Sequence, residues 1–290
     1  MTGNDTRRGI MLMSLTMLIF ASQDGISRYL ADQYNVILVV MIRYWFFAAF
    51  VLTISARRAG SIRQAAATEQ PVLQIFRGLL LAAEVCVMVL AFTLLGLIES
   101  MAIFAAYPLI VAALSGPLLG ETVGRFRWLA IGVGLIGVLI ILKPGFGVFS
   151  PYALIAVLSA AMFALYSLLT RYAARRDSAA TSFFWTGIAG AVGMTVTGIW
   201  FWEPMTPTDY LWMLALCITG ALGHYLLIKT YETAEASAVQ PFAYLQLVFV
   251  SIIGMTVFGE TLAVNVMIGA ALVIAAGIFT ALRERRLARA

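Results

Sequence analysis

The sequence predicts an all-α integral membrane protein of about ten transmembrane helices, arranged as a five-plus-five inverted-topology repeat around a central cavity. Composition gives the first indication, because 62% of the residues are hydrophobic and 11% are charged, against about 45–50% and 25% in soluble domains. Repetition gives the second. Gly120-Glu121-Thr122 and Gly259-Glu260-Thr261 each follow one long apolar segment and precede another. A period of about 140 residues is typical of a transporter built from two copies of one bundle.

Ten apolar segments account for most of the chain. Each approaches the roughly 17–25 residues that a helix needs to cross a bilayer. They cover residues 9–28, 36–56, 72–95, 98–119, 127–143, 151–171, 179–201, 209–229, 238–258 and 264–282. The connections are mostly short, and the longest polar one, residues 57–70, predicts a short surface helix.

The basic residues fall mainly on one of the two sides that these spans define. With the N-terminus inside, one face carries Arg7, Arg8, Arg57, Arg58, Arg63, Arg125, Arg127, Arg171, Arg175, Arg176, Arg283, Arg285, Arg286 and Arg289. The other face carries only Arg28 and Lys143, while Arg43, Arg77 and Lys229 lie within spans. An excess of basic residues marks the cytoplasmic side, so both termini are predicted to be cytoplasmic.

The repeat divides the chain into residues 1–146 and 147–290, which are expected to form one transport unit together. Five spans per half is an odd number, so the second half must enter the membrane from the opposite side. This inverted topology is the arrangement from which alternating access follows most simply. The first thirty residues also resemble a signal peptide, but they match the sixth helix, and their cleavage would remove the opening helix of the first half.

Residue content argues against several chemistries. A single histidine and the absence of a CxxC pair predict no metal site, and no cofactor motif is recognisable. No Walker motif or Ser-His-Asp arrangement is present, so the chain is not expected to be an enzyme. The net charge of +5 comes mainly from arginines that flank the spans, which argues against nucleic-acid binding. Cys86 and Cys217 lie inside spans and are expected to pack there without forming a disulfide.

The matching stretches Ser100 to Glu121 and Ser237 to Glu260 carry a family resemblance. Residues 238–249 (AVQPFAYLQLVF), followed by Phe258-Gly259-Glu260, form its most specific part. The chain resembles the EamA-type exporters of the drug/metabolite transporter superfamily. The resemblance implies ten helices around a cavity and export of amino acids, aromatic ones above all, across a bacterial-type inner membrane. Multidrug efflux, uptake of another metabolite, a membrane-embedded enzyme and a channel remain as alternatives.

Aligning the two halves predicts which residues line the cavity. The matched polar and aromatic positions, with deep residues of the third and eighth helices, are Phe20, Gln23, Glu84, Met88, Met101, Phe104, Phe163, Tyr166, His224, Gln240 and Tyr244. They recur at helical spacing on one face in both copies, and polar residues on such a face are disfavoured by lipid. Packing is the competing interpretation, and it is preferred for Tyr107 and Gln246 on a different face.

Ionisable groups within the spans predict coupling or gating. Glu84 lies near the membrane midplane, so its carboxyl must be paired, protonated or exposed to water. Arg77, two turns away, suggests either an internal Arg–Glu clamp or a shared polar cavity in which Glu84 carries a proton. Asp24 can pair with Arg28 one turn later or with Arg43, as a simple salt bridge or as a latch near the outer mouth.

Two further features predict local structure. Glu121 and Glu260 each follow a glycine and are expected to cap the next helix. Pro108 and Pro241 free backbone carbonyl groups at membrane depth. Because they stand at different positions in the repeat, they predict bends at different depths in the two halves.

Overall fold

The computed structural model describes residues 6–58, 62–120, 124–142, 150–234 and 239–287. Their regular secondary structure is entirely helical. The first half contributes α1 (Thr6–Gln33), α2 (Val36–Arg58), α3 (Ile62–Ala66), α4 (Pro71–Leu95), α5 (Leu97–Phe104), α6 (Tyr107–Leu119) and α7 (Arg125–Leu142). The second half contributes α8 (Ala153–Ala173), α9 (Ala179–Gly198), η1 (Ile199–Phe201), α10 (Pro207–Thr233), η2 (Gln240–Tyr244), α12 (Leu245–Val257) and α13 (Val264–Leu287).

Several helices have the length and composition of membrane spans. The seven that qualify in the described residues are Arg7–Gln33, Val36–Ser55, Pro71–Leu95, Leu97–Leu119, Ala153–Ala173, Ala179–Phe201 and Pro207–Leu227. Three shorter apolar helices coincide with the remaining predicted segments: Trp128–Leu142, Phe242–Val257 and Val264–Thr280. Large apolar side chains such as Leu135, Leu158 and Val196 are exposed, as expected where lipid is the solvent. The prediction of an all-α membrane protein is confirmed, and α3 confirms the short helix expected within residues 57–70.

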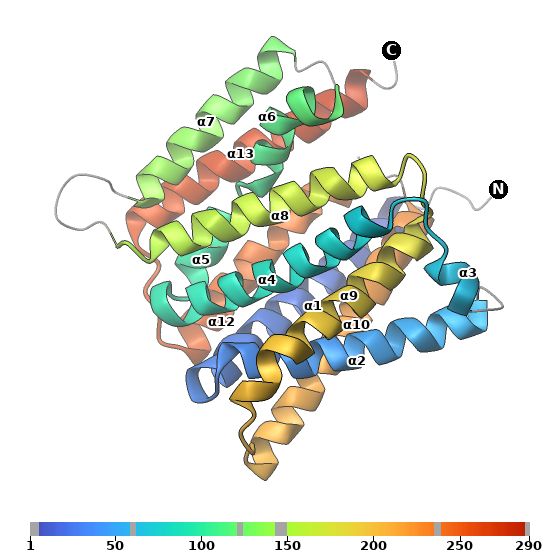
Figure 1. Ribbon diagram of the computed structural model, residues 1–290. Helices are drawn as coiled ribbons and strands as arrows, with labels where there is room; N and C mark the ends of the chain where they lie inside the picture. The colour runs from blue at the N-terminus through green and yellow to red at the C-terminus, as the bar shows by residue number, and fades with distance from the viewer. Residues whose placement is uncertain (1–5, 59–61, 121–123, 143–149, 235–238, 288–290) are drawn as a thin grey trace.

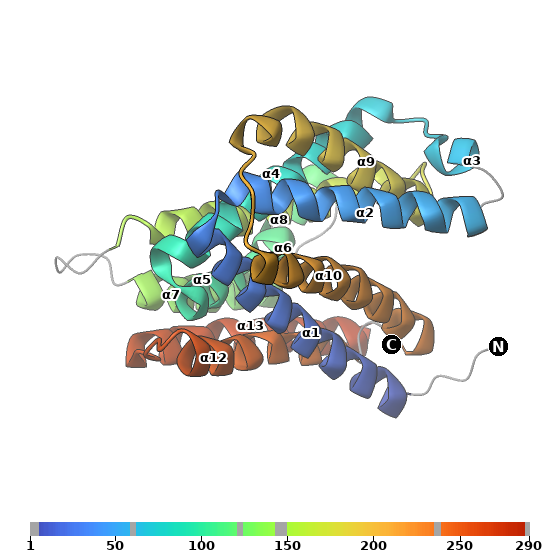
Figure 2. The ribbon, with the colours of Figure 1, turned by 90° about the horizontal axis from the view of Figure 1, so that it is seen from below.

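Helices from the two halves interleave in one bundle (Figure 1). α1 packs along α10, and α4 packs along α8. α2 pairs with α9, and α7 pairs with α13, again across the two halves. α1 begins and α13 ends at the same end of the bundle, where α3 also lies (Figures 1 and 2).

The fourth and ninth predicted spans are both irregular near their middle. α5 ends at Phe104, and α6 begins three residues later, at Tyr107, with Pro108 in its first turn. In the second half, the 3₁₀ helix η2 ends at Tyr244, where α12 takes over. Tyr244 matches Ala105 in the repeat, so η2 and the break between α5 and α6 overlap in the alignment, and bends at different depths stay a prediction. Each proline occupies the first turn of the segment that it starts, α6 for Pro108 and η2 for Pro241; the side chain of Pro241 lies outside the described residues.

Asp177, in the turn between α8 and α9, binds the start of α4. Its carboxylate accepts hydrogen bonds from the Thr68 hydroxyl (2.5 Å), the Glu69 amide (3.1 Å) and the buried Gln74 side chain (2.7 Å). Desolvation opposes its charge, but these donors, with Arg77 nearby, hold the pKa of Asp177 below its usual range. A turn of the second half is thereby fixed to a helix start of the first.

Asp209, in the first turn of α10, makes the reciprocal contact. Its carboxylate accepts hydrogen bonds from the hydroxyls of Tyr29 (3.0 Å), Tyr34 (2.7 Å) and Thr206 (2.6 Å). Tyr29 is near the end of α1, and Tyr34 lies in the turn before α2. A turn of the first half is therefore fixed to a helix start of the second, with the acid and the donors exchanged.

Glu260 connects three segments at the end of the bundle opposite α3. Its carboxylate accepts hydrogen bonds from the amides of Leu97 (2.7 Å) and Ile98 (2.9 Å), and it forms an ion pair with Arg28 of α1. Gly96 has a φ of 100°, and a Cβ there would lie 3.0 Å from the carboxylate, so glycine allows this approach. Glu260 is thus a helix cap, as expected, but it caps α5 of the other half and not the α13 that follows it. Glu121, its repeat counterpart, lies outside the described residues.

The Asp177 network gives a stability prediction. We expect Asp177→Asn to lower the free energy of unfolding by roughly 1–3 kcal/mol, because the amide presents its own donor to groups that are themselves donors. Arg176→Ala, at an exposed position of the same turn, is the matched control and should leave stability nearly unchanged.

The same pair of proteins has a predicted pH dependence. The lowered pKa of Asp177 means that its stabilisation is present above the unfolded-state pKa, about 3.9, and is lost as the pH falls through the folded-state value. Thermal unfolding in detergent should therefore show a wild-type advantage over Asp177→Asn at neutral pH that shrinks below about pH 4. An advantage that is unaffected by pH would contradict the assignment.

Candidate functional site

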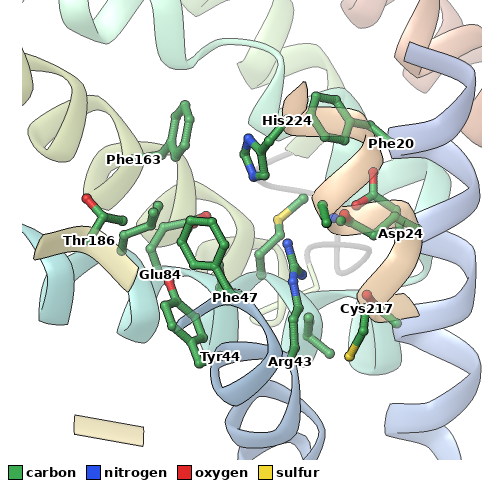
Figure 3. Close-up of a pocket in the computed structure, with 18 of the residues that line it drawn as sticks. Phe20, Asp24, Arg43, Tyr44, Phe47, Glu84, Phe163, Thr186, Cys217 and His224 are labelled. Atoms are coloured by element: carbon green, nitrogen blue, oxygen red, sulfur yellow. The ribbon is translucent and has the colours of Figure 1, made fainter. Parts of the chain in front are cut away.

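A cavity of about 330 Å³ lies in the middle of the bundle. Eight helices contribute to its wall: α1, α2, α4, α5, α8, α9, α10 and α12. Both halves of the sequence therefore line it, and Figure 3 shows side chains from several of these helices converging on one space. The volume falls within the roughly 300–1,000 Å³ that is typical of small-molecule sites.

Most of the residues predicted from the repeat line this cavity. Those that do are Phe20, Gln23, Glu84, Met88, Met101, Phe104, Phe163, Tyr166 and His224. Asp24 and Arg43, predicted for coupling or gating, line it as well. Tyr244 is absent from the wall and packs against Gly277 of α13. Gln240 lies in η2, but its side chain is outside the described residues.

Helical winding explains why the predicted stripe fails in the ninth span. A 3₁₀ helix advances about 120° per residue and an α-helix about 100°. Over the five residues of η2, Gln240–Tyr244, the difference turns the following helix by about 100°, or one α-helical residue. Gln246 accordingly faces the cavity and Leu247 is buried in the core. The interpretation of Gln246 as a packing residue is therefore corrected.

Two groups of aromatic side chains form parts of the cavity wall. In the first, the His224 ring stacks on Phe47 with 5.9 Å between centroids, and it meets the edges of Phe20 and Phe183. In the second, Phe163 contacts Phe104 with 5.3 Å between centroids and Tyr166 with 6.0 Å. Tyr107 packs on the back of this second group, 4.7 Å from Phe163. Such walls suit a flat aromatic solute.

Three charged or ionisable groups also border the cavity: Asp24, Arg43 and Glu84. Asp24 accepts a hydrogen bond from the Gln246 amide at 2.8 Å. Glu84, buried on α4, accepts one from the Ser159 hydroxyl at 2.6 Å. Arg43 acts electrostatically on both carboxyl groups, and Figure 3 shows its guanidinium directed into the cavity. The apolar wall therefore contains a small number of polar groups that can orient a solute.

Arg77 belongs to a separate polar cluster and not to a clamp with Glu84. Its guanidinium donates to the Thr170 hydroxyl at 2.9 Å, to Gln74 and, at 3.5 Å, to the Tyr166 hydroxyl. Arg77 is fully buried and does not line the cavity. Arg28 likewise pairs with Asp32 and Glu260 in the described residues, where its expected partner was Asp24. The Arg77–Glu84 clamp and the Asp24–Arg28 pair, each one of two alternatives, are therefore not found among the described residues.

Several cavity residues were missed by the sequence analysis. Phe47 of α2 and Phe183 of α9 have no counterpart in the aligned stripes, and an aromatic residue in a span is otherwise indistinguishable from a lipid-facing one. Cys217, expected to pack within a span, is buried and also borders the cavity. Gln246 carried a usable signal, since it is the one amide side chain in a mostly apolar helix. Within the described residues no group of three potential metal ligands occurs.

The fold and the cavity define a multi-pass membrane transporter of small solutes. The sequence profile of the EamA-like transporter family matches the chain over residues 7–143 and again over residues 150–282. The chain belongs to this family, which is part of the drug/metabolite transporter superfamily. The resemblance inferred from the sequence is confirmed, and so is the expectation that the chain is not an enzyme.

Curated relatives and a solved structure support the same assignment. An S-adenosylmethionine uptake transporter of Rickettsia bellii is 28% identical over 278 residues, which cover 96% of this chain and 94% of the relative. A riboflavin transporter of Brucella anthropi is 30% identical over 248 residues, covering 83% and 87%. A crystal structure shares the fold with a TM-score of 0.62 at 18% identity, over 97% of this chain and 99% of the other.

The placement of Phe163 and Tyr244 predicts opposite effects of two similar substitutions. Phe163→Leu, in the cavity wall, should raise the KM for transport about two- to tenfold, because a ring contact with the solute is lost. Tyr244→Leu, outside the wall, should lower thermal stability and leave the KM unchanged. A raised KM in Tyr244→Leu would contradict the placement of Tyr244 outside the wall, and an unchanged KM in Phe163→Leu would contradict a solute contact at Phe163.

Proposed function

We propose that this protein transports S-adenosylmethionine, or a solute that similarly joins an amino-acid group to an aromatic ring system, by alternating access. The observation that carries the proposal is the cavity itself, whose wall holds Arg43, Asp24 and Glu84 together with two aromatic groups. A carboxylate fits beside the guanidinium, and ammonium or sulfonium cations fit beside carboxyl groups and aromatic faces.

Charge favours this solute over riboflavin. Riboflavin presents a neutral ring system and hydroxyl groups, which would leave the Arg43 cation unmatched in an apolar surrounding. S-adenosylmethionine carries both signs of charge together with its adenine ring. Relatives named for S-adenosylmethionine and for riboflavin both cover nearly the whole chain, so the preference rests on charge. The names of the former also favour uptake, so we propose uptake where the family resemblance alone suggested amino acid export.

We further propose that ten spans form two inverted repeats, residues 1–146 and 147–290, with both termini in the cytoplasm of a bacterial-type inner membrane. Two matches of one family profile support the division. The packing of α1 on α10 and of α4 on α8 supports it too, since each pair joins a first helix to the other half's third helix. The contacts of Asp177 with Gln74 and of Asp209 with Tyr34 support it as well, since each joins a turn of one half to a helix start of the other.

Transport in proteoliposomes tests the substrate. Labelled S-adenosylmethionine should accumulate saturably and be displaced by unlabelled S-adenosylmethionine more effectively than by riboflavin or phenylalanine. Ala221→Phe, which fills the cavity from α10, should reduce uptake at least tenfold, since the solute then has no room. Leu222→Phe, exposed on the outside of the same helix, is the matched control.

The other solutes decide between the remaining functions. Riboflavin transport without S-adenosylmethionine transport would replace the proposal with a riboflavin carrier, and transport of phenylalanine alone would restore the amino acid assignment. The same assay, run with and without an imposed pH gradient, addresses proton coupling. Glu84 is the group to vary, and a Glu84→Gln protein that retains the response to the gradient would exclude it as the proton carrier.

Cysteine labelling tests the topology. In a protein whose Cys86 and Cys217 are replaced by alanine, Thr208→Cys should react with a membrane-impermeant maleimide in intact cells. Arg176→Cys should react only after permeabilisation, because basic turns remain on the cytoplasmic side. Both positions are exposed, so the difference reports on sidedness. Reaction of Arg176→Cys in intact cells would contradict the proposed orientation.

A further inference from the structure

Arg43 forms no salt bridge within the described part of the protein, although it acts electrostatically on the Asp24 and Glu84 carboxyl groups. The two ion pairs found there both belong to Arg28. Asp24 and Glu84, whose carboxyl groups border the same cavity, accept hydrogen bonds from the neutral donors Gln246 and Ser159. Because a guanidinium carries five N–H donors and cannot be neutralised, a cation here is costly unless an anion accompanies it.

Gln23, which also lines the cavity, has an acceptor atom without a donor in the described part of the chain. Its side chain is 5% exposed, and its buried Oε1 atom has no hydrogen-bond donor among the described residues. Nearly all buried polar atoms in proteins have a partner, so such an atom calls for an explanation. It lies beside Gly220 of α10, where a Cβ would come within 3.1 Å of it, and glycine leaves that side of the amide open.

We propose that these two residues form the subsite for the amino-acid group of the solute. Arg43 binds the carboxylate, and the Oε1 atom of Gln23, with the Asp24 carboxyl one residue later, receives the ammonium group. The stacked Phe47–His224 pair then faces the rest of the molecule. The inference rests on the proposed function in taking the solute to be S-adenosylmethionine-like, but it specifies only the zwitterionic end.

Alternative roles for Arg43 do not account for these contacts. A structural arginine in this bundle is exemplified by Arg77, which is fully buried and bonded to Thr170 and Gln74. Arg43 is half-buried, borders the cavity and lacks such bonds in the part of the chain that the structure describes. Removing Arg77 would leave buried partners unsatisfied, whereas removing Arg43 would relieve an unmatched charge.

The test compares solutes that differ only in the carboxylate. Binding to purified wild-type protein and to Arg43→Met is measured for two pairs: S-adenosylmethionine with its decarboxylated form, and phenylalanine with phenethylamine. In whichever pair the wild type binds, its affinity for the member with the carboxylate should be about tenfold higher or more. Arg43→Met should bind the two members of that pair with equal affinity. Arg43→Lys should recover it only in part, because an ammonium group lacks the bidentate fork.

Two controls separate a binding role from a structural one. Ile42→Met, a volume-conserving change on the same helix, should alter neither preference nor stability. Arg43→Met should itself melt at the same temperature as the wild type or higher, the opposite of what loss of a structural arginine would cause. Gln23→Leu should weaken the binding of S-adenosylmethionine. The wild type should bind a solute with its ammonium group more tightly than the deaminated analogue, and in Gln23→Leu the ratio of the two affinities should fall close to one.

The outcomes distinguish this inference from the proposed function. An unchanged carboxylate preference in Arg43→Met, with S-adenosylmethionine still bound, overturns the subsite alone. An Arg43-dependent preference seen only for phenylalanine supports the subsite and overturns S-adenosylmethionine as the solute. Wild-type protein that binds only riboflavin, or none of these solutes, overturns both.

Discussion

The structure depends on one constraint: away from water, each polar side chain needs its partner inside the protein. Lipid surrounds this bundle, so burial of apolar surface does little to hold its helices together. Directional contacts across the two halves take over that role at the ends of the helices. Asp177 binds the start of α4, Asp209 binds the end of α1, and Glu260 joins α1 to α5. Because each acid lies in one half and its donors lie mainly in the other, the two copies are fixed together at positions that leave the middle of the bundle open.

In the middle of the bundle the two carboxyl groups have hydrogen-bond partners, but two other polar groups of the described residues do not. Asp24 and Glu84 each receive a hydrogen bond from a neutral side chain, so neither requires the nearby arginine. Arg43 and the Oε1 atom of Gln23 are left without partners among the described residues. Arg77 shows what a satisfied arginine looks like in this fold, with its donors directed at Thr170, Gln74 and Tyr166. Arg77 is the more deeply buried of the two arginines. Its hydrogen-bond partners, and not its burial, distinguish it as a structural cation from Arg43, which faces the cavity.

Much of this could be predicted from the sequence, and the failures have physical causes. Hydrophobic runs and the repeat predicted the helices and most of the wall, from Phe20 to His224, because a regular α-helix maps spacing onto a face. Tyr244 was predicted to line the cavity and Gln246 to pack, and the structure has the reverse. Five residues of 3₁₀ winding turn the helix that follows, and residue spacing cannot reveal this turn. The pairings of Arg28 and Arg77 failed for another reason. For these two arginines the sequence suggested partners along the same helix, while Glu260 and Thr170, which contact them in the structure, come from the other half.

An unmatched guanidinium in the cavity also bears on how such a protein would move. In the alternating access that we propose, closing the cavity to both sides would remove water from Arg43, and the cost of an unaccompanied charge rises as its surroundings become less polar. A bound carboxylate supplies the missing anion, so the closed arrangement becomes accessible with solute and stays costly without it. A ligand shifts a conformational equilibrium only by its difference in affinity for the two states. In this cavity that difference comes from the same atoms that recognise the solute, which would link occupancy to the change of access without any separate sensor.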